Sequence, residues 1–159
     1  MRTGFATRFR ARDLLALGLG MVCAALGTGD AAAQDAGRVK TVKGTVYIER
    51  GGGREVALVG SGVRQADTLV TGPDGAVGVT LADDTLLSAG PNSVLVIERF
   101  VYEGNQPGSL ETALTKGTLA VVSGRIAKQA PDAMRVKTPA AILGVRGTEF
   151  VVRASAGSP

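Results

Sequence analysis

Short segments in which apolar and polar residues alternate recur along the chain from about residue 44 onward. In segment 45–49, Val46 and Ile48 fall on one side of an extended backbone, and their polar neighbours fall on the other. Alternation with a period of two residues is typical of a β-strand with one buried face. The pattern returns in four further segments, at 76–81, 94–101, 134–138 and 150–152. The sequence therefore predicts a chain of short strands.

Turn-forming residues separate these segments at intervals of roughly 8–12 residues, a spacing typical of sandwiches, barrels and β-solenoids. Examples are the Gly-Gly-Gly run at 51–53, the Gly-Pro-Asp-Gly run at 72–75 and the polar break at 104–108. Segment 110–119 comes nearest to a helical pattern, but its threonines and Gly117 disfavour a helix. We expect an all-β fold with short strands in two opposed sheets, either a flattened β-solenoid or a β-sandwich.

The apolar positions of these strands predict one hydrophobic core. The only cysteine, Cys23, lies in the N-terminal apolar run, so packing and backbone pairing must stabilise the rest of the chain without disulfides. The residues that we expect in the core are Val46, Ile48, Val79, Leu81, Leu95, Ile97, Leu119, Val121, Val136 and Phe150.

The N-terminal 33 residues have the pattern of a secretory signal peptide. Four arginines precede an uncharged apolar run at 14–26, and Ala31, Ala32 and Ala33 supply the small residues of a cleavage site. The apolar run is shorter than the ~20 residues that span a bilayer. The residue before Cys23 is a valine, which disfavours lipidation. We expect a periplasmic or secreted protein with no stable membrane span after signal cleavage.

Composition argues against catalysis and against nucleic-acid binding. The chain has no histidine, so Ser-His and Cys-His pairs and imidazole metal sites are missing, and we expect neither an enzyme nor a cofactor. The adjacent Asp83 and Asp84 occur in a turn, where carboxylates usually bond nearby backbone N–H groups. Removing the signal peptide takes away four arginines and two aspartates, which lowers the net charge from +4 to +2. Scattered basic residues and few aromatics make a nucleic-acid partner improbable.

The C-terminal segment 138–150 is the most distinctive stretch of the chain. It begins with Thr-Pro-Ala-Ala and ends with Val-Arg-Gly-Thr-Glu-Phe. It offers a strand-breaking proline, a turn glycine and one cation, but no nucleophile paired with a base. We take as candidate interaction residues, here called the closing motif, Val145, Arg146, Gly147, Thr148 and Phe150. Arg146 has two interpretations, because its guanidinium suits a partner's oxygen atoms and strand-end carbonyls equally well.

This motif, with weaker steps spread over 44–152, resembles the FecR-like periplasmic domain family. Asp84 stands where that family usually has glycine in an Asp-Gly-Thr turn. The resemblance divides the chain into a signal peptide at 1–33, an N-terminal linker at 34–43, a FecR-like domain at 44–153 and a short tail at 154–159. The best-known members are transmembrane anti-sigma regulators of iron–siderophore uptake. Only 13 residues precede the apolar run here, so we expect a stand-alone exported form rather than that whole pathway.

The resemblance implies a non-enzymatic domain for protein–protein interaction or ligand sensing in the cell envelope, linked to envelope signalling or iron-uptake regulation. Its partner would be another envelope protein, and the sequence does not fix the oligomeric state. The alternative is a module that binds glycan or peptidoglycan. That function requires the aromatic residues Tyr47, Phe100 and Tyr102 to share one exposed groove where sugars can stack.

The signal-peptide pattern predicts cleavage between Ala33 and Gln34. Mass spectrometry of the exported protein should therefore find a chain that starts at Gln34. A full-length product retained in the membrane would contradict the prediction.

Overall fold

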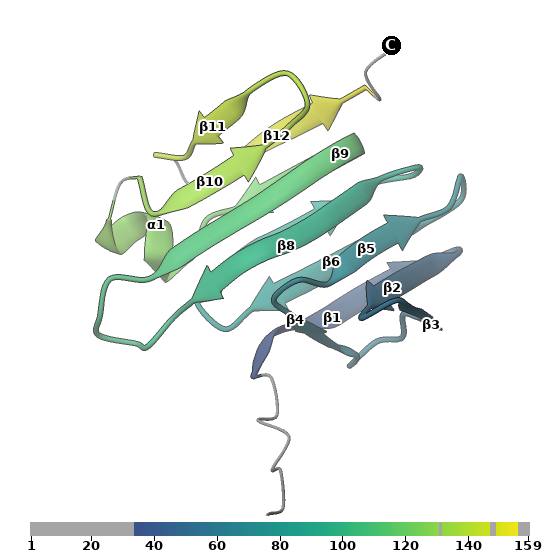
Figure 1. The fold of residues 1–159 in the computed structure, drawn as a ribbon, viewed down its shortest axis with the longest axis horizontal. Coiled ribbons are helices and arrows are strands. Elements are labelled where there is room, and N and C mark those ends of the chain that lie inside the picture. Colours follow the sequence, from purple (N-terminus) through teal and green to yellow (C-terminus); the bar gives the residue numbers. More distant parts are fainter. Residues whose placement is uncertain (1–33, 131, 147–148, 156–159) are drawn as a thin grey trace, which may run out of the picture. The chain divides into compact units, whose positions relative to one another are not determined.

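The computed structural model describes residues 34–130, 132–146 and 149–155, which belong to one compact unit spanning Ala32–Pro159. Within them, almost all regular structure is β-strand (Figure 1). The single helix described, α1, is one short segment, Arg125–Gln129. The strands are β1 Asp35–Lys43, β2 Val46–Arg50, β3 Gly53–Val56, β4 Gly62–Arg64, β5 Thr68–Thr71, β6 Ala76–Leu81, β7 Leu86–Ala89, β8 Val94–Val101, β9 Ser109–Val122, β10 Met134–Lys137, β11 Ile142–Gly144 and β12 Glu149–Ala154. The all-β prediction is confirmed.

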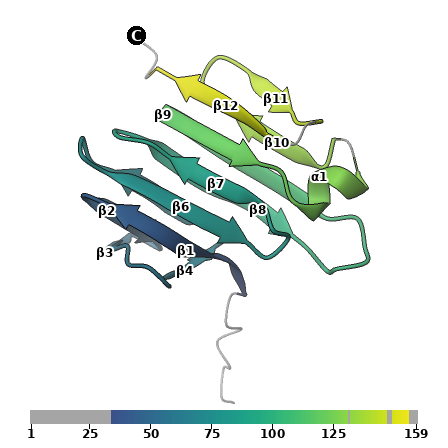
Figure 2. The same ribbon diagram turned by 180° about the vertical axis from the view of Figure 1, so that it is seen from behind.

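The 14-residue strand β9 joins the whole sheet together. Its first part pairs with β8 in the antiparallel sense and with β10 in the parallel sense. Its last part pairs with β7 and β12, both antiparallel. The hydrogen-bonded order β3-β2-β5-β8-β9-β7-β6-β1-β4 is therefore continuous (Figures 1 and 2). The strands form one curled sheet, and the predicted pair of separate opposed sheets is not confirmed.

The inward faces of the strands meet in one hydrophobic core. Nine of the ten residues predicted for the core, all except Phe150, are at most 2% exposed. Phe150 is only half-buried, because β12 pairs with β9 alone and leaves that ring at the margin of the sheet. Val152, two residues further along the same face, is 8% exposed and belongs to the core instead.

Residues 34–43 do not form the linker that the sequence analysis expects. Asp35–Lys43 is strand β1, which pairs with β4 and β6, and its Val39 is fully buried. The register of the β1–β6 pair shifts between Val39 and Thr41. Such a bulge puts an extra residue into one strand and interrupts the alternation of period two, so the sequence pattern concealed this strand.

Asp84 occupies the turn between β6 and β7 with a φ angle of 66°. This is the left-handed region, which glycine enters freely and which aspartate tolerates better than most other residues. The replacement of the family's usual glycine is therefore compatible with the same kind of turn. Asp84 also forms an exposed ion pair of 3.0 Å with Arg125 at the start of α1.

The change of pairing partners along β9 occurs at Gly117, which has a φ angle of 95°. A Cβ atom at this position would collide with Oγ of Ser93. The buried Ser93 hydroxyl accepts a hydrogen bond of 3.0 Å from N–H of Thr118 and donates one of 3.2 Å to the Thr118 carbonyl. The backbone N–H of Ser93 donates a hydrogen bond of 2.8 Å to the Thr71 hydroxyl. These contacts fix the corner at which β9 passes from one part of the sheet to the other.

Substituting Gly117 by alanine should destabilise the protein, because the new methyl group meets both an unfavourable φ angle and the Ser93 hydroxyl. Gly51→Ala is the matched control, since Gly51 also has a positive φ, 55°, but has open space around it. We expect a loss of about 1 kcal/mol at Gly51 and of roughly 3 kcal/mol or more at Gly117 in urea unfolding. Equal losses would contradict the proposed corner.

Candidate functional site

The closing motif spans the end of the β10–β11 hairpin and the start of β12. Val145 is 5% exposed, and its N–H donates a hydrogen bond of 3.0 Å to a carbonyl of β10. Arg146, the next residue, is exposed. Phe150 contacts the core from the margin of the sheet. Gly147 and Thr148 lie outside the described residues. The structure thus places Val145 and Phe150 against the core and leaves Arg146 at the surface.

The Thr-Pro-Ala-Ala run that precedes the motif forms the turn of the β10–β11 hairpin. The N–H of Thr138 donates to the Ala141 carbonyl at 2.8 Å, and the Ala141 N–H donates to the Thr138 hydroxyl at 3.1 Å. A proline and a hydrogen-bonding threonine suit a tight turn of this kind. Beyond the turn, Ile142 in β11 is 67% exposed. The hairpin therefore presents an exposed apolar side chain four residues before the exposed cation of the motif.

A small charge cluster fastens β10 to the strands next to it. The Lys137 ammonium lies 2.6 Å from a carboxylate oxygen of Glu98 in β8 and 3.1 Å from one of Glu111 in β9. Hydrogen bonding to Lys137 lowers the pKa of Glu111, and the bond with Glu98, together with that with Glu111, raises the pKa of Lys137. All three side chains are partly exposed, so the cluster orients β10 more than it stabilises the fold.

Two buried carboxylates form hydrogen bonds with groups in and near turns, and the sequence analysis expects this for Asp83. Asp83 is fully buried and accepts hydrogen bonds from the Thr85 hydroxyl at 2.7 Å and from the Ile126 N–H at 3.3 Å. Asp67 is 1% exposed and forms a two-bond pair with the Arg50 guanidinium, at 2.8 and 2.6 Å. This hydrogen bonding raises the pKa of Arg50 above its ordinary value. Both carboxylates are thus occupied by contacts within the fold.

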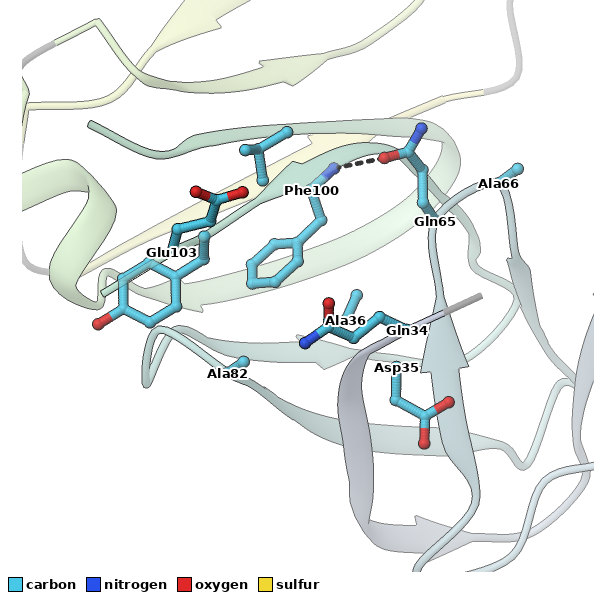
Figure 3. A pocket seen from close by; sticks show the side chains of 10 residues that line it. Gln34, Asp35, Ala36, Gln65, Ala66, Ala82, Phe100 and Glu103 are labelled. Atoms are coloured by element: carbon cyan, nitrogen blue, oxygen red, sulfur yellow. Dashed lines mark hydrogen bonds between the residues drawn. The ribbon is translucent and has the colours of Figure 1, made fainter. Parts of the chain in front are cut away.

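A cavity of about 480 Å³ lies between the start of β1 and the end of β8 (Figure 3). The Phe100 ring points into it, and the Phe100 N–H donates a hydrogen bond of 3.2 Å to the Gln65 side-chain oxygen. Two amides and two carboxylates complete its polar lining, which comprises Gln34, Gln65, Asp35 and Glu103. Apolar rings beside a few polar groups are typical of small-molecule sites. The sequence analysis singled out Phe100 and Tyr102 but did not predict the cavity, because its walls come from segments far apart in the chain.

The three aromatic residues singled out from the sequence do not share one groove. Phe100 and Tyr102 both line the cavity. Tyr47 lies elsewhere, with the Arg54 guanidinium 5.0 Å from the centre of its ring. The Tyr102 hydroxyl accepts a hydrogen bond of 3.3 Å from Arg125, which raises the pKa of that guanidinium. The three rings therefore do not form the shared groove that the glycan interpretation requires, and only Phe100 and Tyr102 line one cavity.

Among residues 34–130, 132–146 and 149–155, no three His, Cys, Asp or Glu side chains are grouped so that they could hold a metal ion. In the same part of the chain, no helix has the length and apolar character needed to cross a membrane.

Comparison with known proteins identifies the family. No curated protein and no solved structure matches the chain. The family model described as FecR protein matches residues 67–159, which are 93 of the 159 residues. The match contains the corner at Gly117, the β10–β11 hairpin and the whole closing motif. The chain belongs to the FecR protein family.

Proposed function

We propose that this chain is an exported, non-enzymatic FecR domain that binds another protein of the cell envelope and acts in envelope signalling or iron-uptake regulation. The family match over residues 67–159 carries the proposal, because the best-known FecR proteins are regulators in the envelope. The closing motif supplies the surface that would bind the partner. Its exposed Arg146 follows a buried Val145, so the backbone is anchored to the core immediately before an exposed cation.

Exposed apolar residues shortly before Arg146 in the chain support a protein partner over a small ion. Ile142 in the neighbouring β11 is 67% exposed, and Leu143 is 38% exposed. Apolar side chains next to an arginine are characteristic of the anchor residues of protein interfaces. A carboxylate or a row of carbonyl oxygens on the partner would match the five N–H donors of the guanidinium.

Replacing Arg146 by alanine should leave the melting temperature nearly unchanged and weaken partner binding by about tenfold or more. Arg135→Ala is the matched control, because Arg135 is an exposed arginine on β10 outside the motif. A pull-down from envelope extract with quantitative mass spectrometry finds the partner, and titration of that purified partner gives the affinity. If Arg146→Ala instead melts many degrees lower, Arg146 is a structural strut and the proposed surface loses its main residue.

The cavity at Phe100 and Tyr102 favours a second candidate function, the binding of glycan or peptidoglycan fragments. Two rings for stacking, together with amide and carboxylate groups for sugar hydroxyls, line one space of about 480 Å³. The cavity shares no residue with the closing motif. The two functions can therefore be tested separately.

If sugars bind in the cavity, Phe100→Ala should weaken the binding of soluble peptidoglycan fragments by about tenfold, because it removes a stacking ring. Tyr47→Ala removes an aromatic ring outside the cavity and should leave that affinity unchanged. Isothermal titration calorimetry on the folded variants measures both. Equal loss in the two variants, or the absence of binding to the unmodified protein, would exclude the candidate.

A further inference from the structure

Strand β12 has one free edge. Among the described strands it pairs only with β9, and Figure 2 shows it (yellow) beyond β9 at the end of the row formed by β1, β6, β7 and β9. It has six residues, whereas the other edge strands β3, β4 and β11 have four, three and three. A free edge presents unpaired N–H and C=O groups that can accept a further strand. β12 is therefore the longest site for strand addition in the described chain.

The side chains of β12 alternate strictly between its two faces. Glu149, Val151 and Arg153 are exposed on the outer face, and Val151 is 66% exposed. On the inner face, Val152 is buried and Phe150 is half-buried. The outer face thus carries a carboxylate, a central apolar residue and a guanidinium at equal spacing.

The two charges on β12 are not matched within the described chain. Across the β9–β12 pair, Glu149 lies opposite Val122 and Arg153 lies opposite Thr118. The Cα atoms of residues 149 and 153 are about 13 Å apart along an extended strand, too far for an ion pair between them. Neither residue takes part in an ion pair among the described residues. The edge therefore offers two opposite charges to an incoming strand.

We propose that this incoming strand is β12 of a second copy of the chain, paired antiparallel about a twofold axis at Val151. In this register, Glu149 lies opposite Arg153 of the partner subunit, and the symmetry repeats the ion pair at the other end. Val151 meets Val151 of the partner subunit on the outer face. On the inner face, the half-exposed ring of Phe150 meets Val152 of the partner subunit. The outer face thus matches both charges and apolar residues, and the inner face matches apolar residues.

The charge pattern selects this register over its neighbours. A parallel arrangement in register would place Glu149 against Glu149 of the partner subunit and Arg153 against its equivalent, which is destabilising. An antiparallel shift by two residues removes both ion pairs, and a shift by four brings like charges together. A shift by one residue sets inner side chains against outer ones, which the pleat forbids. Of the registers compared, only the pairing about Val151 sets opposite charges against each other at both ends and Val151 against Val151 of the partner subunit.

The proposal is tested by exchanging the two charges. Sedimentation velocity on the full protein, in the form in which cells accumulate it, should show a reversible monomer–dimer equilibrium. We expect a dissociation constant between about 1 μM and 1 mM, the range of small interfaces. Glu149→Arg and Arg153→Glu should each weaken self-association by about tenfold or more, because each places like charges opposite each other twice. An equimolar mixture of the two variants should associate as strongly as the unmodified protein, since both ion pairs return in the mixed dimer, one in the original order and one reversed.

Lys40→Glu is the matched control, because Lys40 is exposed on β1 and its replacement changes the net charge as Arg153→Glu does. It should leave the dimer intact, and circular dichroism should show that all variants are folded. The doubly exchanged variant E149R/R153E should dimerise normally and so excludes a general effect of either substitution. A monomeric unmodified protein, undisturbed dimers in the single variants, or no association in their mixture would overturn the proposal.

Discussion

The fold depends on the corner that Gly117 makes in β9. A strand that pairs with β8 and β10 along one part and with β7 and β12 along the other must change direction between them. The positive φ angle of Gly117 and the absence of a side chain allow the Ser93 hydroxyl to lie against the backbone there. That hydroxyl bonds both backbone groups of Thr118, so the N–H and the carbonyl of Thr118 each have a partner at the corner. The sheet can therefore curl around one core.

The same strand positions the closing motif. Its first part orients β10, with the help of the Lys137 contacts to Glu98 and Glu111, and β10 in turn holds Val145 by a backbone hydrogen bond. Its last part supports β12. Arg146 is consequently presented between two segments that are both fixed to β9. A recognition residue held in this way loses little conformational freedom on binding, which favours affinity.

Some charged residues of the domain maintain the fold, and others are exposed at its surface. Asp67 bonds Arg50, Asp83 bonds the N–H of Ile126 in the short helix, and Lys137 bonds Glu98. These contacts maintain the fold. Arg146 and the two ends of β12 are exposed on the C-terminal part of the sheet. In this FecR-family domain, exposed charges of this kind favour protein binding through electrostatic complementarity. The separate cavity at Phe100 would serve a smaller ligand.

The sequence by itself determined the strand content, the turns, most of the core and the family, because period-two alternation and glycine-rich breaks are local signals. It missed β1, where a bulge broke the alternation, and it placed Phe150 deeper than the edge position of β12 allows. Only the tertiary structure decided that β9 is shared by the whole sheet. It also brought Gln34, Gln65 and Phe100 into one cavity and left the outer edge of β12 free. These features depend on which distant segments become neighbours, and no local pattern of residues encodes that choice.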